Sequence, residues 1–528
     1  MTKRIQKNTG SFYTCSTVAD YICKWAIQKG NETLLEPSFG DGQFIESAFS
    51  RYKSLGNNNP IIYGVELQES TFEKFLKKEI SINGHCGDFL DYHCKEKVDA
   101  VIGNPPYVSL KNLKETDKIK AIKLMNKYQL IMPTAGSLWM PFVVHSTEQI
   151  SFGGKLGFVL PYELTYVRYA FKLWEYLKNN FGQITVIRIF DDFFPEVDVE
   201  TVILLAEDKG KSTNFVKYQI FSSVTDLIQD KCLHIGEIEI NDIVSMKKPF
   251  DAQLVSDEVW DIVDRLKRVG SLSPILPECK FKIGYVSGNK KYFHPTTDDI
   301  KKYGISENSL VPCIINSREI NGKQSLGIDT LGLNNNSYLF FPSSTSEVEK
   351  EYISFGEQSG VSKGYKCRTR KPWFITPCVE IPDVILTVFG SVPRLMTNKG
   401  NFAVSNSLLG GFFKSDTTGE ELVCRWYNSL TLLMIEIYIH SLGGGTLVLI
   451  PGEVDQLSIL SSFPKNRVDE VYSQLDDNMK QNGTESTYQL GDEVVLKNIY
   501  GLTENEINEI HTALRQLRYW RSPEERRG

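Results

Sequence analysis

Apolar and polar positions alternate with two different periods along residues 15–210. Short apolar runs, typical of buried strands, occur at 33–36, 60–66, 98–102, 155–160 and 184–190. Between these runs, apolar residues recur at helical spacing, which predicts helices at 18–27, 44–50, 70–80, 137–150 and 168–179. A β-hairpin that closes near 203–206 completes the set. This alternation predicts an α/β fold, a Rossmann-like and largely parallel sheet with helices on both faces.

The pattern changes after the polar segment 207–212, which we interpret as a linker. Short strands and turns rich in Gly, Asn and Ser follow, and they predict an irregular α+β domain. Near the C-terminus, Thr503 and Glu506 have the spacing of a capping box and predict a helix through Leu517. We therefore expect three parts, with bounds at 1–210, 211–464 and 465–528, the last of them helical.

The composition is typical of a globular protein, with 41% hydrophobic and 23% charged residues among 528. The sequence has no run of about 18 apolar residues and no apolar signal segment at its start, so we expect no membrane contact and a cytoplasmic location. The ten cysteines form no CxxC pair, which favours reduced thiols. The pairs His85-Cys86 and His93-Cys94 lack recognised zinc spacing, so we expect no metal.

Charge is unevenly distributed along the chain. The net charge is −6, but residues 280–400 contain 16 Lys and Arg against 11 Asp and Glu, or +5, which leaves −11 for the remainder. A relatively basic segment in an acidic protein is compatible with a module that faces DNA.

Residues suited to ligand binding follow successive predicted strands. The turn at 36–44 begins with Glu36 and contains Gly40 and Gly42, whose backbone can approach a ligand closely. The next strand ends in Glu66, where an acid would meet the ribose diol of a nucleotide-type ligand. The first two predicted strand ends therefore offer carboxylates for ammonium or hydroxyl groups.

Two further segments, one before and one after the strand at 98–102, also carry such residues. Asp88 and Phe89 are an acid and an aromatic ring suited to an adenine. The strand at 98–102 stops at Asn104-Pro105-Pro106-Tyr107, because a Pro-Pro pair cannot donate to a strand ladder. The Asn104 amide oxygen and the Pro105 carbonyl can accept both protons of an exocyclic amino group, and the Tyr107 ring can hold the planar group behind it. The loop indicates methylation of an amino group on a base.

With these motifs, the chain resembles the N6-adenine DNA methyltransferases of the γ arrangement, the modification enzymes of restriction systems. The resemblance implies S-adenosylmethionine as cofactor, a catalytic domain over 1–210 and a target-recognition domain over 211–464. In that family the Gly-rich turn binds the methionine part of the cofactor, the second acid binds its ribose and the Asp-Phe pair binds its adenine. The segment 9–14 is similar to the family's cofactor-side segment, although Cys15 stands where the family has Pro. The implied cofactor-binding residues are Tyr13, Thr14, Glu36, Gly40, Gly42, Glu66, Asp88, Phe89 and Asn104.

The resemblance also implies how the target base is held. Asp192-Phe193-Phe194-Pro195 is similar to the family's hairpin motif, in which an aromatic ring stacks on the target. Phe194 is the better positional match, with Phe193 as the second choice. The implied catalytic residues are Asn104, Pro105, Tyr107 and Phe194. Because a base inside a duplex cannot be reached, the adenine would flip out and lie between Tyr107 and Phe194.

Double-stranded DNA is the implied partner of a chain that we expect to be monomeric. A cognate restriction endonuclease would be a separate gene product. The cluster 363–371 is the densest basic run, with aromatic residues interleaved, and most of its contacts should go to phosphate. The expected DNA-binding residues are Lys290, Lys291, Arg318, Lys363, Lys366, Arg368, Arg370, Lys371 and Arg394.

Alternative functions stay open from the residues alone. An N4-cytosine methyltransferase would also use an exocyclic amine, although Asn at the first loop position favours adenine in the family. Glutamine N5-methyltransferases share Asn-Pro-Pro-Tyr but are much shorter than this chain. Asp198 with the segment 207–209 imitates a nuclease pattern of separated acids and a lysine, which we attribute to coincidence.

Overall fold

The chain forms two compact units, residues 1–254 and 255–528, each with its own sheets. The computed structural model describes residues 14–78, 80–133, 136–190, 200–245, 250–276, 278–320, 325–329, 338–342, 347–442 and 445–521. No helix in these described ranges is both long and apolar enough to cross a membrane.

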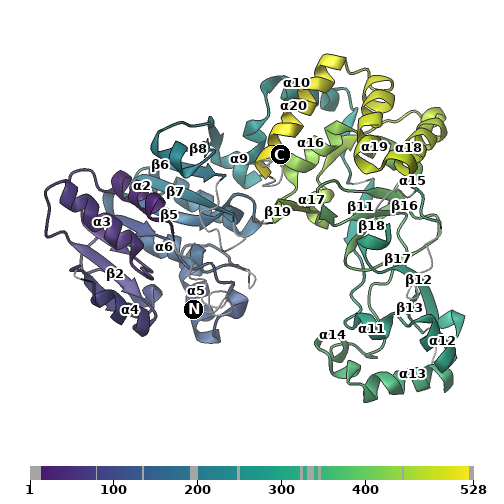
Figure 1. Ribbon diagram of the computed structural model, residues 1–528, viewed down its shortest axis with the longest axis horizontal. Coiled ribbons are helices and arrows are strands. Elements are labelled where there is room, and N and C mark those ends of the chain that lie inside the picture. The colour runs from purple at the N-terminus through teal and green to yellow at the C-terminus, as the bar shows by residue number, and fades with distance from the viewer. Residues whose placement is uncertain are drawn as a thin grey trace. The chain divides into compact units, whose positions relative to one another are not determined.

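A nine-stranded sheet forms the first unit, in the order β3-β2-β1-β4-β5-β7-β6-β8-β9 (Figure 1). Strands β3, β2, β1, β4 and β5 are parallel, whereas β7 runs antiparallel to both β5 and β6. The strand order reverses between β1 and β4, the position at which open α/β sheets bind ligands. The strands are β1 Leu34–Glu36, β2 Ile62–Glu66, β3 Asn83–Cys86, β4 Val98–Gly103, β5 Ile150–Pro161, β6 Phe181–Ile189, β7 Thr201–Lys209, β8 Phe215–Phe221 and β9 His234–Glu239.

Both faces of this sheet are buried. Along β4, Ala100 and Ile102 join an apolar core with helices α2 and α3. Val101 is buried on the opposite face, because successive strand residues alternate, and α6 packs against β4 and β5 there. The helices are α2 Ser16–Ala26, α3 Gln43–Ser54, α4 Glu69–Leu76, α5 Glu115–Lys127, α6 Trp139–Gln149, α7 Phe171–Lys178, α8 Val224–Ile228 and α9 Ile240–Ser245. The predicted α/β architecture is confirmed.

The linker expected at 207–212 is wrong. Residues up to Lys209 continue β7, and β8 and β9 then add two further strands to the same sheet. The end of β7 leaves the apolar core, so its side chains are polar although the strand continues. The first compact unit consequently extends to 254 rather than 210. Helix α5, which the sequence pattern did not predict, follows the loop after β4.

The second unit contains several small sheets. A four-stranded antiparallel sheet has the order β11-β18-β14-β16, and a three-stranded sheet has the order β13-β12-β17. Two further sheets pair β10 with β21 and join β15, β20 and β19. The strands are β10 Leu272–Pro274, β11 Cys279–Ile283, β12 Leu310–Ile314, β13 Tyr338–Phe340, β14 Val384–Thr387, β15 Phe389–Gly390, β16 Leu395–Thr397, β17 Ala403–Val404, β18 Leu408–Phe413, β19 Ser441–Leu442, β20 Thr446–Val448 and β21 Ser458–Leu460.

The helical C-terminal segment packs within this second unit rather than apart from it. Helix α20 lies against α16, and α18 lies against α15. The capping box predicted at its start is present, because Thr503 N donates to Glu506 Oε2 at 2.8 Å and Glu506 N donates to Thr503 Oγ1 at 3.3 Å. The helices are α10 Asp257–Arg268, α11 Lys290–Phe293, α12 Thr297–Tyr303, α13 Glu347–Gln358, α14 Tyr365–Arg368, α15 Gly419–Trp426, α16 Ser429–Tyr438, α17 Pro451–Val454, α18 Val468–Asn482, α19 Thr484–Gly491 and α20 Glu504–Arg521, with a π-helical turn at Asp492–Lys497.

Candidate active site

The carboxyl ends of three adjacent strands carry polar side chains. Glu36 ends β1, Glu66 ends β2, and Asn104 follows β4 directly. Since β2, β1 and β4 are parallel neighbours, the three residues lie along one edge of the sheet. The structure thus brings together the side chains that the sequence placed at separate strand ends, at the point where the strand order reverses.

The carboxyl group of Glu36 is buried, with 2% of the residue exposed. Its Oε2 atom meets no hydrogen-bond donor among the described residues. Burial raises the pKa of Glu36 well above its ordinary value, the charges of Asp41 and Glu66 raise it further, and the Ile45 main-chain N–H acts in the opposite direction. A buried acceptor without a donor is costly, so Oε2 is suited to receive a donor from a ligand.

Glu66 supports the turn that follows Glu36. Its Oε2 accepts from Gly40 N at 3.0 Å, and its Oε1 accepts from Gln68 N at 2.8 Å. Burial raises the pKa of Glu66 above its ordinary value. Gly40 and Gly42 have φ of 53° and 89°, and a Cβ on Gly42 would overlap the ring of Phe75. The turn therefore requires glycine at these positions because of its backbone conformation and, at Gly42, because of the Phe75 ring; the predicted approach of its backbone to a ligand stays a prediction.

Asp88 and Phe89 form a short turn after β3. The Asp88 Oδ1 atom accepts from Leu90 N at 2.9 Å, which fixes the start of the 3₁₀ turn Phe89–Asp91. Phe89 is 2% exposed and packs against α6, with ring centroids 5.0 Å from Phe142 and 4.8 Å from His145. The Phe89 ring is thus part of the core, and the Asp88 carboxylate remains at the surface of the site.

The Asn104 side chain is oriented by a residue that lies far from it in the sequence. Its Nδ2 donates to Thr14 Oγ1 at 3.2 Å, and its main-chain oxygen accepts from Ser38 Oγ at 3.2 Å. The Tyr107 hydroxyl donates to the main-chain oxygen of Val159 in β5 at 2.9 Å. Burial raises the pKa of Tyr107 well above its ordinary value. The amide and the phenol ring are therefore both held in fixed orientations.

Two predicted site residues, Tyr13 and Phe194, lie outside the described residues, as does the second-choice Phe193. Their predicted contacts stay predictions. Phe194 lies in the sequence between β6, which ends at Ile189, and β7, which begins at Thr201.

In the second unit, Arg370 connects two groups of predicted basic residues. Its guanidinium donates to the main-chain oxygens of Val286 and Ser287 at 2.6 and 2.8 Å. This contact holds the loop before α11 against the segment of α14. Helix α11 carries Lys290 and Lys291, and helix α14 carries Lys366 and Arg368. The Tyr365 ring is 67% exposed, with the Lys366 and Arg368 charges 5.7 and 5.4 Å from its centroid.

Arg394 does not belong to this exposed group. Only 4% of it is exposed, and its guanidinium donates to the main-chain oxygen of Ile320. We therefore withdraw the expectation that Arg394 contacts DNA, because a side chain enclosed in the core cannot reach a duplex. The sequence shows that Arg394 is positively charged, but it does not show that the side chain is buried and hydrogen-bonded inside the protein. The other predicted basic residues, Arg318, Lys363 and Lys371, are exposed.

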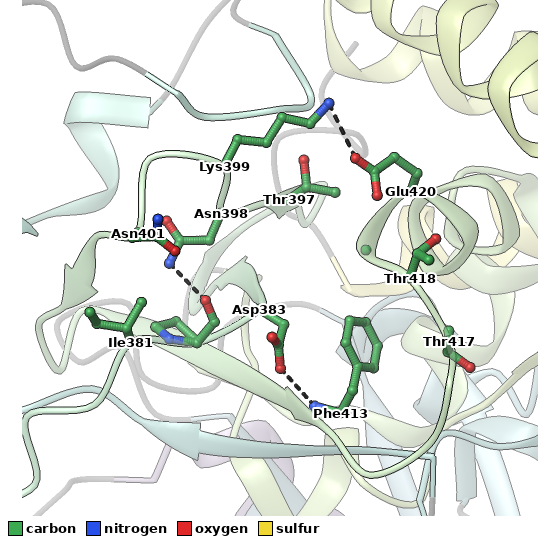
Figure 2. A pocket seen from close by; sticks show the side chains of 12 residues that line it. Ile381, Asp383, Thr397, Asn398, Lys399, Asn401, Phe413, Thr417, Thr418 and Glu420 are labelled. Carbon is green, nitrogen blue, oxygen red and sulfur yellow. Dashed lines mark hydrogen bonds and ion pairs between the residues drawn. The ribbon is translucent and has the colours of Figure 1, made fainter.

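A pocket of about 310 Å³ lies elsewhere in the second unit, between β14, β16 and the start of α15 (Figure 2). Its polar side chains contact each other or the main chain. Lys399 pairs with Glu420 at 3.2 Å, and Asp383 Oδ2 accepts from Phe413 N at 2.9 Å. Asn398 donates to Pro382 O at 2.7 Å. The Lys399–Glu420 ion pair joins the segment after β16 to α15, and the other two contacts join the segment before β14 to the end of β18 and to the segment after β16. None of the predicted site residues lines the pocket.

Sequence reasoning missed two side chains at the first-unit site. Ser38 contacts the Asn104 main chain, and Lys120 of α5 contacts Asp88 at 2.5 Å. Ser38 lies inside the Gly-rich turn, so its place in that motif was an available signal. The sequence contains no such signal for Lys120, because helix α5 was not predicted. Only the tertiary structure brings Lys120 close to Asp88 after β3.

A doubly wound sheet that reverses its strand order beside buried acids has its expected ligand site at the carboxyl ends of these strands. The family model for N-6 DNA methylases matches residues 1–226, and that for the C-terminal domain of Type II methyltransferase M.Eco57I matches 247–496. Together the two matches identify the chain as an S-adenosylmethionine-dependent DNA methyltransferase, with an N-terminal part similar to the N-6 DNA methylases and a C-terminal part similar to that of M.Eco57I.

Similar proteins support this classification. Type II methyltransferase M.AccI of Acinetobacter calcoaceticus is 24% identical over 418 residues, 75% of this chain and 74% of that protein. M.BstVI of Geobacillus stearothermophilus is 27% identical over 356 residues, 56% of this chain and 61% of that protein. The Type IIL restriction-modification enzyme MmeI, solved in complex with DNA, shares the fold, with a TM-score of 0.61 and 11% identity over 98% of this chain and 80% of that chain.

Proposed function

We propose that this chain transfers a methyl group from S-adenosylmethionine to N6 of adenine at a specific site in duplex DNA, as the modification enzyme of a restriction-modification system. The observation that carries the proposal is the orientation of Asn104. Its amide nitrogen is held by Thr14 at 3.2 Å, directly after β4 and beside the strand that ends in buried Glu36. An amide whose nitrogen is engaged in this way has its oxygen directed away from Thr14.

The first-unit acids fit the cofactor. Bound S-adenosylmethionine supplies an electrophilic sulfonium methyl group. Glu36 would accept a hydrogen bond from the methionine ammonium, since its buried Oε2 meets no donor in the described protein. Glu66 would accept from the ribose hydroxyls, and Asp88 would accept from the adenine amino group. Gly40 and Gly42 would allow the backbone of the turn to approach the methionine part.

The loop after β4 fits an exocyclic amine. The Asn104 amide oxygen and the Pro105 carbonyl would accept the two N6 hydrogens, which favours a pyramidal nitrogen with a localised lone pair. That lone pair would attack the methyl group in line, so positioning and electrostatics would supply most of the rate enhancement. The Tyr107 ring, tethered through its hydroxyl to β5, would stack on the flipped base. Phe194 would form the opposite wall.

DNA would be held by the exposed basic residues of the second unit. The group around α11 and α14 places positive charge beside the exposed Tyr365 ring. Contacts of Lys and Arg with phosphate fix the register of a protein on a duplex without reading its sequence. The residues that we propose for these contacts are Lys290, Lys291, Arg318, Lys363, Lys366, Arg368 and Lys371, with Arg370 supporting them from inside. A monomer without an attached endonuclease would suffice for this reaction.

The reaction product distinguishes adenine from its rivals. The protein would be incubated with labelled S-adenosylmethionine and plasmid DNA, and the DNA digested to nucleosides. We expect label in N6-methyl-2′-deoxyadenosine, and an Asn104→Ala variant should lose that label. Label in N4-methylcytosine would replace the adenine proposal by its nearest alternative, and label in protein alone would favour glutamine methylation.

A further inference from the structure

Lys120 connects helix α5 to the turn that carries Asp88. Its Nζ lies 2.5 Å from Asp88 Oδ2 and 2.5 Å from Asp91 Oδ2. The side chains of Lys120 and Asp88 are 29% and 27% exposed, so both ions are partly shielded from water. One cation thus bridges two acids at the ends of a single turn.

This bridge holds the turn from the side opposite to its core contact. Phe89, between the two acids, is buried against α6, and Asp88 Oδ1 already accepts from Leu90 N. Lys120 fixes the second oxygen, so the carboxylate has contacts at both oxygens and a single orientation. Each carboxylate oxygen can accept two hydrogen bonds. Asp88 Oδ2 therefore retains capacity for one further donor while Lys120 is bound.

The segment that contains α5 is closed at its base by two main-chain hydrogen bonds between residues that flank the helix. Leu110 N donates to Gly136 O at 2.8 Å, and Leu138 N donates to Val108 O at 2.8 Å. Ala121 and Met125 of α5 are fully buried. Burial by itself lowers the pKa of Lys120, but its hydrogen bonds to the two acids outweigh that effect and leave the pKa above its ordinary value. The ammonium is accordingly charged at neutral pH, and the helix presents it from a fixed support.

We propose that Lys120 is a positioning residue for the adenine of the cofactor. Its ammonium holds the Asp88 carboxylate in one orientation, so that Oδ2 accepts a hydrogen bond from the adenine 6-amino group. This inference rests on the proposed role of Asp88 and extends it to the discrimination between purines. An ionised carboxylate accepts hydrogen bonds and cannot donate them. It therefore favours a 6-amino purine and disfavours a 6-oxo purine, whose oxygen would face the carboxylate.

The test compares two probes by calorimetry on the full-length protein, S-adenosylhomocysteine and S-inosylhomocysteine. The variants are K120M, which keeps a long apolar stem, K120R, which keeps the cation, and D88N. The matched control is K118M, because Lys118 lies on the same helix and contacts Glu115 of that helix at 3.4 Å. The decisive quantity is the dissociation constant of S-inosylhomocysteine divided by that of S-adenosylhomocysteine.

For K120M, we expect S-adenosylhomocysteine to bind about tenfold more weakly, the lower end of the loss seen when residues that orient metal ligands are removed. S-Inosylhomocysteine should bind as before, so the ratio should fall by the same factor. K120R should restore most of the ratio and K118M should leave it unchanged. Equal weakening of both probes in K120M would show a structural role only and would overturn the inference, as would an unchanged or strengthened affinity for S-adenosylhomocysteine.

D88N separates this inference from the proposed function. If D88N loses the preference for adenosine and K120M keeps it, Asp88 binds the adenine without Lys120, and the inference alone fails. If D88N also keeps the preference while the wild-type protein binds S-adenosylhomocysteine, the proposed role of Asp88 fails and the inference fails with it.

Discussion

Glu36 offers a prediction in which protein stability and cofactor affinity change in opposite directions. Burial, together with the charges of Asp41 and Glu66, raises the pKa of Glu36 well above its ordinary value in the free protein. A carboxyl group with a raised folded-state pKa contributes stability that is fully present below its unfolded pKa. That contribution is lost as the pH rises through the folded-state pKa. The free protein should therefore become less stable as pH rises through this window, and Glu36→Gln should remove that loss.

Affinity should follow the reverse course. A ligand ammonium favours the ionised carboxylate, so binding to protonated Glu36 releases a proton. The dissociation constant of S-adenosylhomocysteine should then fall with rising pH, by at most about tenfold per pH unit for one released proton. Glu36→Gln replaces a charge-assisted hydrogen bond, worth about 1.5–3 kcal/mol, with a neutral one. The difference from a neutral hydrogen bond is about 1–1.5 kcal/mol, so we expect about five- to tenfold weaker binding at pH 7 and little dependence on pH.

Calorimetry between pH 5 and 7, below the ordinary pKa of an α-amino group, measures both effects. Titrations in two buffers of different ionisation enthalpy give the number of protons released, and thermal unfolding of the free protein gives the stability. Glu69→Gln is the matched control, because Glu69 is an exposed acid in the first turn of α4. A wild-type affinity independent of pH, or an equal slope in Glu36→Gln, would refute the role given to this carboxyl group.

Further predictions concern the other parts of the site. Thr14→Val removes the acceptor of Asn104 Nδ2 and should lower kcat by about tenfold, the effect of losing a hydrogen bond worth about 1.4 kcal/mol; an unchanged kcat would show that this hydrogen bond does not orient the amide. Gly42→Ala should lower the melting temperature more than Gly56→Ala, since both glycines have positive φ but only the Gly42 position is blocked by the Phe75 ring. Replacing Lys290, Lys366 and Arg368 by Gln should reduce the slope of log affinity against log salt in DNA-binding titrations by about 0.9 for each phosphate that the variant no longer neutralises. The same change at Lys301 and Lys302 of α12 is the control, and an equal reduction there would assign the effect to net charge.

The sheet and its functional edge could be predicted because short apolar strands and the residues after them are local features of the sequence. Glu36, Glu66 and Asn104 each follow such a strand, and parallel pairing then brings them together. Helix α5 escaped prediction because only Ala121 and Met125 of its residues are buried, which leaves little apolar periodicity. The hydrogen bond between Asn104 and Thr14 and the ion pair between Lys120 and Asp88 depend on tertiary packing, which no local sequence pattern encodes.

The contact of Arg370 with the main chain of Val286 and Ser287 bears on how the specificity of such an enzyme could be altered. The Arg370 side chain joins the loop before α11 to the segment of helix α14, so the two should be transferred together in any chimaera. A library that varied all basic residues of the region alike would dismantle the support along with the surface. Variation limited to the outward positions, such as Lys366 and Arg368, would change what the surface presents while the scaffold beneath it is preserved.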